Sequence, residues 1–355
     1  MVRRRRTSRK KSGLGCGGMF FGLFLLAALC AGGVAWFIFL PAGPASETFV
    51  EILPGSSSTQ IGMQLEKAGV VRSRYGFDLV RIWKHGVLKA GEYRFDHSVP
   101  VTEVYARIAR GDVFTLPVTI PEGATRFDIA VRVEQAGLVK KEDFLTATVN
   151  ETALIADLDP QARSLEGYLF PDTYRFPRKA TATQIATAMV RRFRTAAAGI
   201  GLGTRMGNGD TTRDVHSVVT LASLVERETA VNVERPLVAS VLTNRLTKKM
   251  PLMTDPAVIY GLEVEGKWRG SIYQSDLAHD TPYNTYRHAG LPPGPIANPG
   301  LPSLRAALDP AATSYLYFVA AGADPQGKSR FATTLDEHNK NVASYRLAVK
   351  QAGGH

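Results

Sequence analysis

Residues 50–71 read VEILPGSSSTQIGMQLEKAGVV, and residues 118–139 read VTIPEGATRFDIAVRVEQAGLV. Aligned on their Pro-Gly and Pro-Glu-Gly turns, the two stretches keep hydrophobic residues and a late glycine at a constant offset of 68 residues. Each stretch predicts a short strand, a turn, a helix with apolar residues about four positions apart, and a glycine that ends the helix. This internal repeat predicts two small α+β modules.

The sequence around the two copies supports the same α+β class. Residues 88–95 alternate as a strand does, and residues 101–110 have the pattern of a helix that ends at Gly111. We therefore expect repeated modules over 47–158, preceded by a linker at 41–46 that consists of Pro, Ala, Gly and Ser. These residues alone leave open whether the modules are a structural spacer or grip an extended polymer.

A long apolar stretch lies upstream of the modules. Residues 19–40, MFFGLFLLAALCAGGVAWFIFL, hold no charged side chain in 22 positions and would span about 33 Å as a helix, enough to cross a bilayer. A cleaved signal peptide, which is the alternative, usually has a shorter apolar core followed by small residues, whereas this stretch ends in WFIFL. The sequence therefore predicts an uncleaved transmembrane helix.

The charge distribution predicts how this helix is oriented. Residues 1–18 form a basic tail with seven Arg and Lys side chains, whereas Glu47 and Glu51 follow the apolar stretch. We therefore expect a single-pass protein of the plasma (inner) membrane, with a cytoplasmic N-terminus and an extracytoplasmic body. The whole chain has 43 Lys and Arg against 32 Asp and Glu, a net charge of +11, and without the seven tail residues the excess is only +4. So small an excess argues against a nucleic-acid partner.

A change of composition near Asp159 marks a second domain, with a mixed α/β pattern, which we place at 159–350 and follow with a short tail at 351–355. Its loops are rich in aromatic rings, amides and prolines. Such side chains suit a carbohydrate groove, because sugar rings present apolar faces and hydroxyl edges together.

The most informative motif in this domain is a predicted helix at 214–230. In that helix Glu226 falls in the same apolar stripe as Val215 and Val219. A carboxyl group there is costly unless it is paired or protonated, and a raised pKa is what a general acid needs. The structural alternative is a buried salt bridge to an arginine such as Arg245.

Two other carboxyl groups compete with Glu226. Glu228 falls at the opposite margin of the same apolar arc, and Glu166 lies in a loop that also fits a turn with a capping carboxylate. Metal and serine chemistry fit poorly, because the seven His residues lack metal-ligand spacing and no GxSxG motif is present. We therefore expect neither a metal nor a cofactor.

Several motifs, taken in order, resemble one family. They are LEGYLFPDTY at 165–174, ASLVERETA at 222–230, VLTNRL at 241–246, TDPAVIYG at 254–261 and EHN at 337–339. Together they resemble the endolytic murein transglycosylases of the MltG or YceG-like family, over about residues 47–346.

The resemblance implies a fold and an activity. The modules at 47–158 would be LysM-like, and the domain at 159–350 would be a peptidoglycan lytic transglycosylase, a lyase whose catalytic glutamate is Glu226. It would cleave MurNAc-GlcNAc bonds within nascent glycan strands, leave 1,6-anhydro-MurNAc ends and act as a terminase of glycan elongation. The partners would be glycan strands and peptidoglycan polymerases such as penicillin-binding proteins.

The remaining site residues are open predictions. Asn284, Tyr286 and Asn298 are candidates for sugar contacts or for support of an oxocarbenium ion, and Glu166 and Asp255 are further candidates for substrate binding. Two other functions stay open: a non-catalytic peptidoglycan-binding scaffold, and a glycan hydrolase that uses a second carboxylate such as Glu166 or Asp255.

Overall fold

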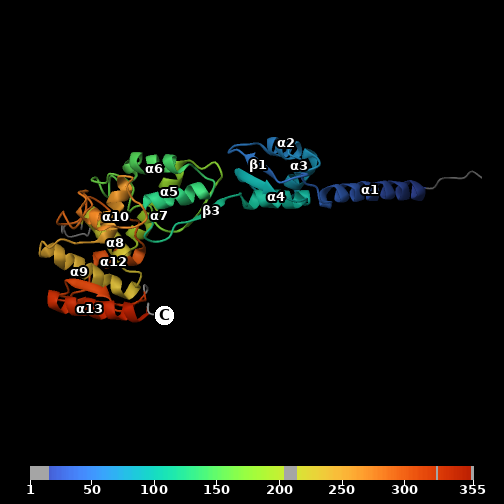
Figure 1. Ribbon diagram of the computed structural model, residues 1–355. Helices are drawn as coiled ribbons and strands as arrows, with labels where there is room; N and C mark the ends of the chain where they lie inside the picture. The colour runs from blue at the N-terminus through green and yellow to red at the C-terminus, as the bar shows by residue number, and fades with distance from the viewer. Residues whose placement is uncertain (1–15, 204–213, 325–326, 353–355) are drawn as a thin grey trace, which may run out of the picture. The chain divides into compact units, whose positions relative to one another are not determined.

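The computed structural model describes residues 16–203, 214–324 and 327–352. The chain divides after Phe114 into two units, Met1–Phe114 and Thr115–His355. Most of the predicted basic tail, residues 1–15, and the last three residues lie outside the described ranges. Figure 1 labels the helices and strands, and each unit is described by itself.

Unit 1 begins with a long apolar helix and continues as a small α+β module. Its elements are α1 (Cys16–Phe39), β1 (Thr48–Ile52), α2 (Ser58–Lys67), α3 (Arg74–Lys84), β2 (Gly91–Phe95) and α4 (Val101–Arg110). β1 and β2 pair antiparallel, with Val50 opposite Tyr93. Three helices cover this strand pair and enclose a core that includes Leu65, Phe77 and Ile108.

Helix α1 has the composition of a membrane-crossing segment. Met19–Phe39 has a mean hydropathy of 2.2, and none of its most apolar window is buried within the protein. By length and composition it is able to span a membrane. The end of α1 is built into unit 1, because Ile38 packs against the module core and Ala42 forms a bridge with Val99.

The two copies of the repeat have the same local structure. α2 begins at the N-cap Ser57 and α5 (Arg126–Gln135) at the N-cap Thr125, 68 residues later, and each hydroxyl accepts a hydrogen bond from a backbone N–H three residues on. After each helix a glycine, Gly69 or Gly137, has a φ of 69° or 73°. A residue with a side chain rarely adopts this conformation, so both helices end there.

Unit 2 starts with the second copy of this pattern. The order is β3 (Leu116–Thr119), α5, α6 (Lys141–Asn150), a short 3-10 helix η1 (Thr152–Leu154), β4 (Thr173–Phe176) and α7 (Ala182–Ala198). β3 and β4 pair antiparallel, with Val118 opposite Tyr174. Each copy therefore has two helices between its paired strands and a third helix after them.

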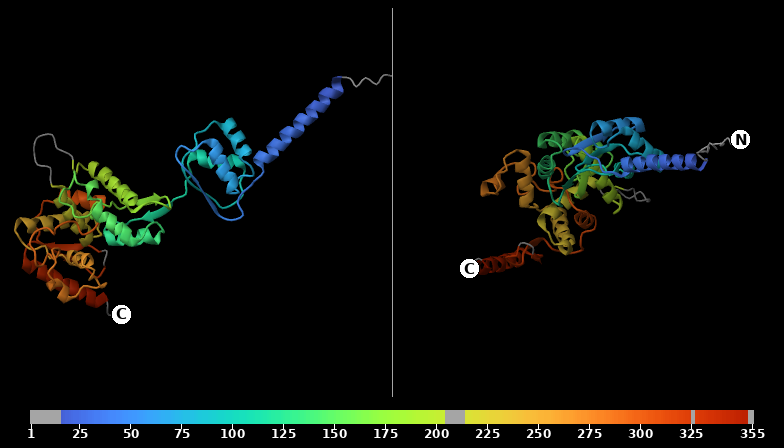
Figure 2. Two further views of the ribbon diagram at one scale, coloured as in Figure 1. Left: turned by 90° about the horizontal axis from the view of Figure 1, so that it is seen from above. Right: turned by 90° about the vertical axis from the view of Figure 1, so that its right-hand side faces the viewer.

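The rest of unit 2 is largely helical. It comprises α8 (Val215–Glu228), η2 (Asn232–Glu234), α9 (Arg235–Thr247), α10 (Asp255–Val264), α11 (Gln274–Ala278), α12 (Leu301–Leu308), β5 (Tyr317–Ala320), β6 (Ser329–Ala332) and α13 (Leu335–Ala352). α8 packs against α9, α10 and α12, and α13 packs against the β5–β6 pair at the outer edge of the unit (Figure 2).

The predicted mixed α/β architecture with one N-terminal apolar helix is confirmed in this coarse form. The division into units differs from the predicted modules at 47–158, because the second copy shares one core with the later helices. Ile129 and Phe144 of the repeat belong to the same buried cluster as Val219 and Leu224 of α8. Contacts of this kind join the copy to unit 2.

Candidate active site

The site is centred on the C-terminal end of α8. Asp214 caps the helix by accepting a hydrogen bond from the Ser217 N–H, and the helix ends at Glu228. All residues from Val218 to Val225 are buried. α8 is therefore surrounded by protein over two turns, and this burial brings the two glutamates of its last turn under cover.

Glu226 is held from two sides. Its side chain is 4% exposed, Oε1 accepts a hydrogen bond of 2.9 Å from Arg235 Nη2, and Oε2 accepts one of 2.9 Å from the Gly300 N–H. Gly300 is the N-cap of α12, where a negative charge is favoured. Burial raises the pKa of Glu226, while the Gly300 N–H and the Arg235 charge oppose this shift.

A second carboxylate lies beside this pair. Glu122 belongs to the Pro-Glu-Gly turn of the second repeat copy, and its Oε2 is 3.5 Å from Arg235 Nη2. Its side chain is 45% exposed, whereas that of Arg235 is 5% exposed. A Cβ on Gly123 would lie 3.5 Å from Cγ of Glu226, so the turn covers the glutamate closely. The arginine is thus shared by a buried and an open carboxylate.

Sequence reasoning missed Arg235, Glu122 and Gly300 as partners of Glu226. The structural alternative, a buried salt bridge between Glu226 and an arginine, is present in the structure, but the arginine is Arg235, at 2.9 Å. Arg245 instead donates to the carbonyls of Leu316 at 2.7 Å and Leu252 at 2.8 Å. A signal for Glu122 was available in the repeat. The turn of the first copy reads Leu-Pro-Gly, and the second copy carries a glutamate in the same turn.

Burial alone does not show which of Glu226 and Glu228 is the better candidate for the catalytic carboxyl, because both are largely covered. Burial and the nearby Asp255 charge raise the pKa of Glu228 to about 7, with the charge of Arg245 acting in the opposite direction. Two of the predicted substrate-binding residues, Asp255 and Tyr286, lie close enough to Glu228 to interact with its charge. They also contact each other, because the Tyr286 hydroxyl donates a hydrogen bond of 2.6 Å to Asp255 Oδ1. α8 thus presents one buried carboxyl toward Arg235 and another toward the Asp255 side.

Glu166 and Asn298 form a buried pair away from solvent. Asn298 Nδ2 donates to Glu166 Oε1 at 2.6 Å and to the Ala124 carbonyl at 2.9 Å, and its Oδ1 accepts from the Leu169 N–H at 2.8 Å. Burial raises the pKa of Glu166 to about 7, against the hydrogen bond from the Arg126 N–H. This pair ties the loop of Glu166 and Leu169 to the loops of Ala124 and Asn298, whose near neighbours Gly123 and Gly300 lie against Glu226.

Asn284 is also fully buried. Its amide donates to the carbonyls of Leu277 and His279, and its oxygen accepts from the Tyr286 N–H. Sugar hydroxyls would reach Asn284 or Asn298 only if these internal hydrogen bonds broke. Of the predicted site residues, Asp255 and Tyr286 lie nearest to solvent.

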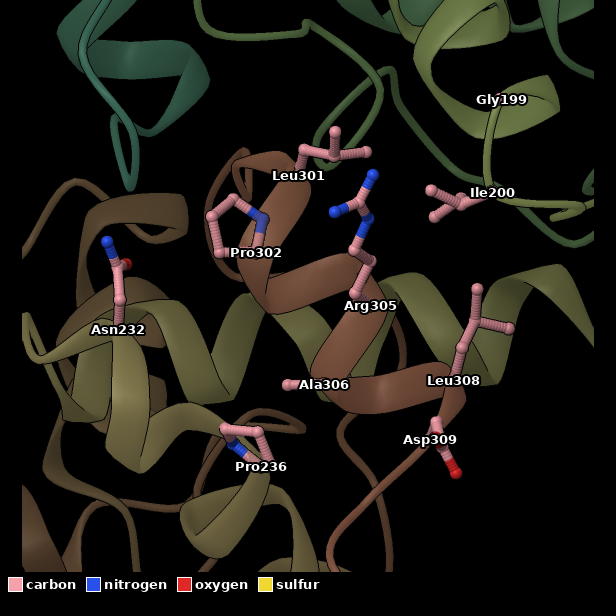
Figure 3. Close-up of a pocket in the computed structure, with 10 residues that line it drawn as sticks. All are labelled: Gly199, Ile200, Asn232, Pro236, Leu301, Pro302, Arg305, Ala306, Leu308 and Asp309. Atoms are coloured by element: carbon pink, nitrogen blue, oxygen red, sulfur yellow. The ribbon is translucent and has the colours of Figure 1, made fainter.

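A hollow of about 640 Å³ runs along α12 (Figure 3). Pro236 and Leu301, which follow Arg235 and Gly300 in the chain, both line it, and Arg305 projects among the lining residues. This volume lies within the range that ligand sites usually have. Within the described ranges, no group of three or more His, Cys, Asp or Glu side chains is placed to hold a metal ion.

Comparisons with known proteins agree on one family. The family model described as "YceG-like family" matches residues 50–344. The chain is 34% identical over 324 residues to the endolytic murein transglycosylase of Bacillus subtilis (strain 168), covering 86% of this chain and 87% of that protein. It is 32% identical over 362 residues to the protein of the same name from Streptococcus pneumoniae (strain D39), covering 91% of this chain and 64% of that longer protein.

A solved structure is similar as well. The 2.6 Å crystal structure of a yceG-like protein from Listeria monocytogenes aligns with a TM-score of 0.55 and 34% sequence identity, over 83% of this chain and 99% of that one. The family model alone spans well over half of the chain. The chain therefore belongs to the YceG-like family.

Proposed function

We propose that this chain is a membrane-anchored lytic transglycosylase that cleaves peptidoglycan within its glycan strands. Two relatives that it matches over most of its length are named endolytic murein transglycosylases. The observation that carries the proposal is the position of Glu226. It is a buried carboxyl with a raised pKa, bonded to Arg235 and to the N–H at the start of α12, and the residues that follow these two partners in the chain line a hollow of about 640 Å³.

The proposed reaction needs one carboxyl group and no water. Glu226 gives its proton to the glycosidic oxygen between MurNAc and GlcNAc as the bond from that oxygen to C1 breaks. The C6 oxygen of the same MurNAc then bonds to C1, and its proton passes to Glu226, which regains its starting state. A nucleophile tethered to the substrate has a large advantage over free water. The products are a free GlcNAc hydroxyl and a 1,6-anhydro-MurNAc end.

Arg235 suits both states of this cycle. When Glu226 is a carboxylate, the Arg235 bond at 2.9 Å and the Gly300 N–H stabilise its charge. When Glu226 is protonated, Glu122 still offers Arg235 a negative partner at 3.5 Å. An arginine left unpaired in a buried position would otherwise be costly.

The substrate would approach Glu226 from the side on which Glu122 is exposed to solvent. Glu122 is the exposed member of the carboxylate pair, and we propose that the glycan passes along the hollow beside α12. Asp255 and Tyr286 remain the proposed sugar contacts. For Asn284, Asn298 and Glu166 we propose structural roles, because their hydrogen bonds are directed into the protein.

The proposal extends to location and role. Met19–Phe39 would anchor the chain in the plasma (inner) membrane in a single pass, with the N-terminus cytoplasmic and the body outside. LysM-like binding of glycan by the two repeat copies, termination of nascent strands and partnership with peptidoglycan polymerases belong to the same proposal.

Product analysis tests the reaction. Full-length protein in detergent is incubated with purified peptidoglycan, and the released fragments are weighed. Anhydro ends, one water lighter than hydrolytic ends, support the lytic reaction, and early products that are long fragments support cleavage within strands. Reducing ends would instead identify a two-carboxylate hydrolase, and intact strands that retain bound protein would identify a scaffold.

A further inference from the structure

One face of α3 exposes an apolar surface that the proposed reaction does not use. Ile82 is 64% exposed and Trp83 61%, and Tyr75 and Leu79 of the same helix are exposed as well. Val87, three residues after the end of the helix, is 82% exposed. On the helix Tyr75, Leu79, Ile82 and Trp83 fall within about 100° of one another, so they form a single stripe. Contiguous exposed apolar surface on a protein marks an interaction site.

The second copy of the repeat lacks this surface. Its equivalent helix, α6, keeps the buried positions, since Phe144 is buried 67 residues after the buried Phe77. At the exposed positions, the residues that replace Tyr75, Leu79, Ile82 and Trp83 are Glu142, Thr146, Val149 and Asn150. Folding of the module therefore does not require an apolar face here. The face is a property of the copy that follows α1.

α3 lies across the end of α1. A Cβ on Gly76, near the start of α3, would touch the Phe37 ring of α1. Near the other end of α3, Trp83 and Phe39 line one hollow of about 620 Å³. Both ends of α3 thus lie close to the last turn of α1. A membrane crossed by α1 would have its surface at this level.

The charges on α3 fit such a surface. Arg72, Arg74, Arg81 and Lys84 lie on or next to α3, and Asp78 is the single acidic residue of the helix. Lys84 lies over the Trp83 ring at 4.5 Å, and Arg74 over the Tyr75 ring at 4.7 Å. Aromatic rings beside basic side chains are typical of segments that lie at the boundary between lipid headgroups and acyl chains.

We propose that the face formed by Tyr75, Leu79, Ile82, Trp83 and Val87 rests in the headgroup region of the extracytoplasmic leaflet, next to the point where α1 leaves the membrane. The occupant of this face is lipid, with anionic headgroups on the basic side chains. The inference rests on the proposed membrane crossing by α1. This contact would hold unit 1 against the membrane at a constant distance from the bilayer.

Tryptophan quenching tests this contact. The chain has three tryptophans, Trp36 in α1, Trp83 in α3 and Trp268 in unit 2. Full-length proteins that keep one tryptophan each, with Phe at the other two positions, are reconstituted in vesicles of phosphatidylethanolamine and phosphatidylglycerol. The vesicles also contain phosphatidylcholine brominated near the ester end or near the methyl end of its acyl chains. An interfacial helix buries its apolar face by about 5–10 Å, so Trp83 should be quenched most by bromine near the ester end.

The three single-tryptophan proteins distinguish failure of the α3 proposal from failure of the proposed membrane crossing. Quenching of Trp36 without quenching of Trp83 above the level of Trp268 would overturn the α3 proposal and leave the anchor intact. Absence of quenching at Trp36 would remove the membrane crossing, and the α3 proposal with it.

A matched pair of variants gives a second reading. Ile82→Asp should lower lipid quenching of Trp83 and raise its quenching by iodide in the buffer. Val149→Asp, at the equivalent position of the second copy, should change neither. Both side chains are exposed, so neither change disturbs a core. Equal quenching in Ile82→Asp and the parent protein would contradict the proposal.

Discussion

Replacing Asn298 with alanine tests whether this amide holds the site together or contacts substrate. The change leaves the buried Leu169 N–H without its acceptor and removes a donor from the buried Glu166 carboxyl. Each buried polar group that loses its partner costs about 1–3 kcal/mol, so we expect a loss of about 2–6 kcal/mol. Whole proteins have only about 5–15 kcal/mol of stability, so the effect is large.

The assay follows Trp268, which is the tryptophan of unit 2, in a background with Phe at Trp36 and Trp83. In a domain of this size 1 kcal/mol shifts Tm by about 2–4 °C, so Asn298→Ala should lower Tm by about 10 °C. An Asn298→Ala protein with parental Tm that fails to cleave glycan would refute the structural role and restore the sugar contact.

Asn298→Asp adds a pH control to this experiment. It keeps an oxygen for the Leu169 N–H but places a second carboxyl against Glu166, whose pKa burial raises to about 7. At low pH the pair holds a proton and can keep its hydrogen bond. A carboxyl whose pKa is raised by folding gives stability that is lost as pH rises through that pKa. The variant should therefore lose more stability than the parent between about pH 5 and 8, and a parallel pH dependence would contradict this pairing.

Two further changes test the site and its surroundings. Arg235→Gln removes a charge that lowers the pKa of Glu226, so the alkaline limb of kcat/KM should move to higher pH while kcat falls. An unmoved limb would show that another group titrates. Gly167→Ala should unfold unit 2, because φ is +88° there and the new methyl would lie 2.5 Å from Cγ of Pro295. Gly137→Ala should cost only about 1 kcal/mol, because φ is +73° but the space around the new methyl is open. Equal losses of stability in the two variants would count against the packing account.

Sequence reasoning predicted the elements whose signals are local. The repeat is visible because its turns, caps and final glycines recur at one spacing, and Ser57 and Thr125 cap equivalent helices. The sequence predicted less accurately which segments, distant in the chain, pack into one core. Nothing in the second copy shows that Ile129 and Phe144 share a core with α8, because its hydrophobic pattern is the same whichever surface covers it.

In the site, too, local features were predicted from the sequence and long-range contacts were not. The helical pattern correctly placed Glu226 in buried surroundings, but α8 is buried on all sides from Val218 to Val225, and in its last turn Glu228 is largely covered as well, although Arg227 between the two glutamates is exposed. A helical wheel separates two faces only when one of them meets solvent. The partners of Glu226 come from a turn of the repeat, the start of α9 and the start of α12, and only the folded chain brings these segments together.

The most direct test of the account compares Glu226→Gln with Glu228→Gln. Both changes keep the shape of a buried side chain at the end of α8, and general acid–base catalysis is worth about 100-fold to 10,000-fold. With both proteins folded, as judged by Trp268 fluorescence, the initial rate of anhydro-end formation from purified glycan strands is measured. We expect at least about a 100-fold loss for Glu226→Gln and a rate near the parental value for Glu228→Gln. Parental activity in Glu226→Gln would contradict the central claim.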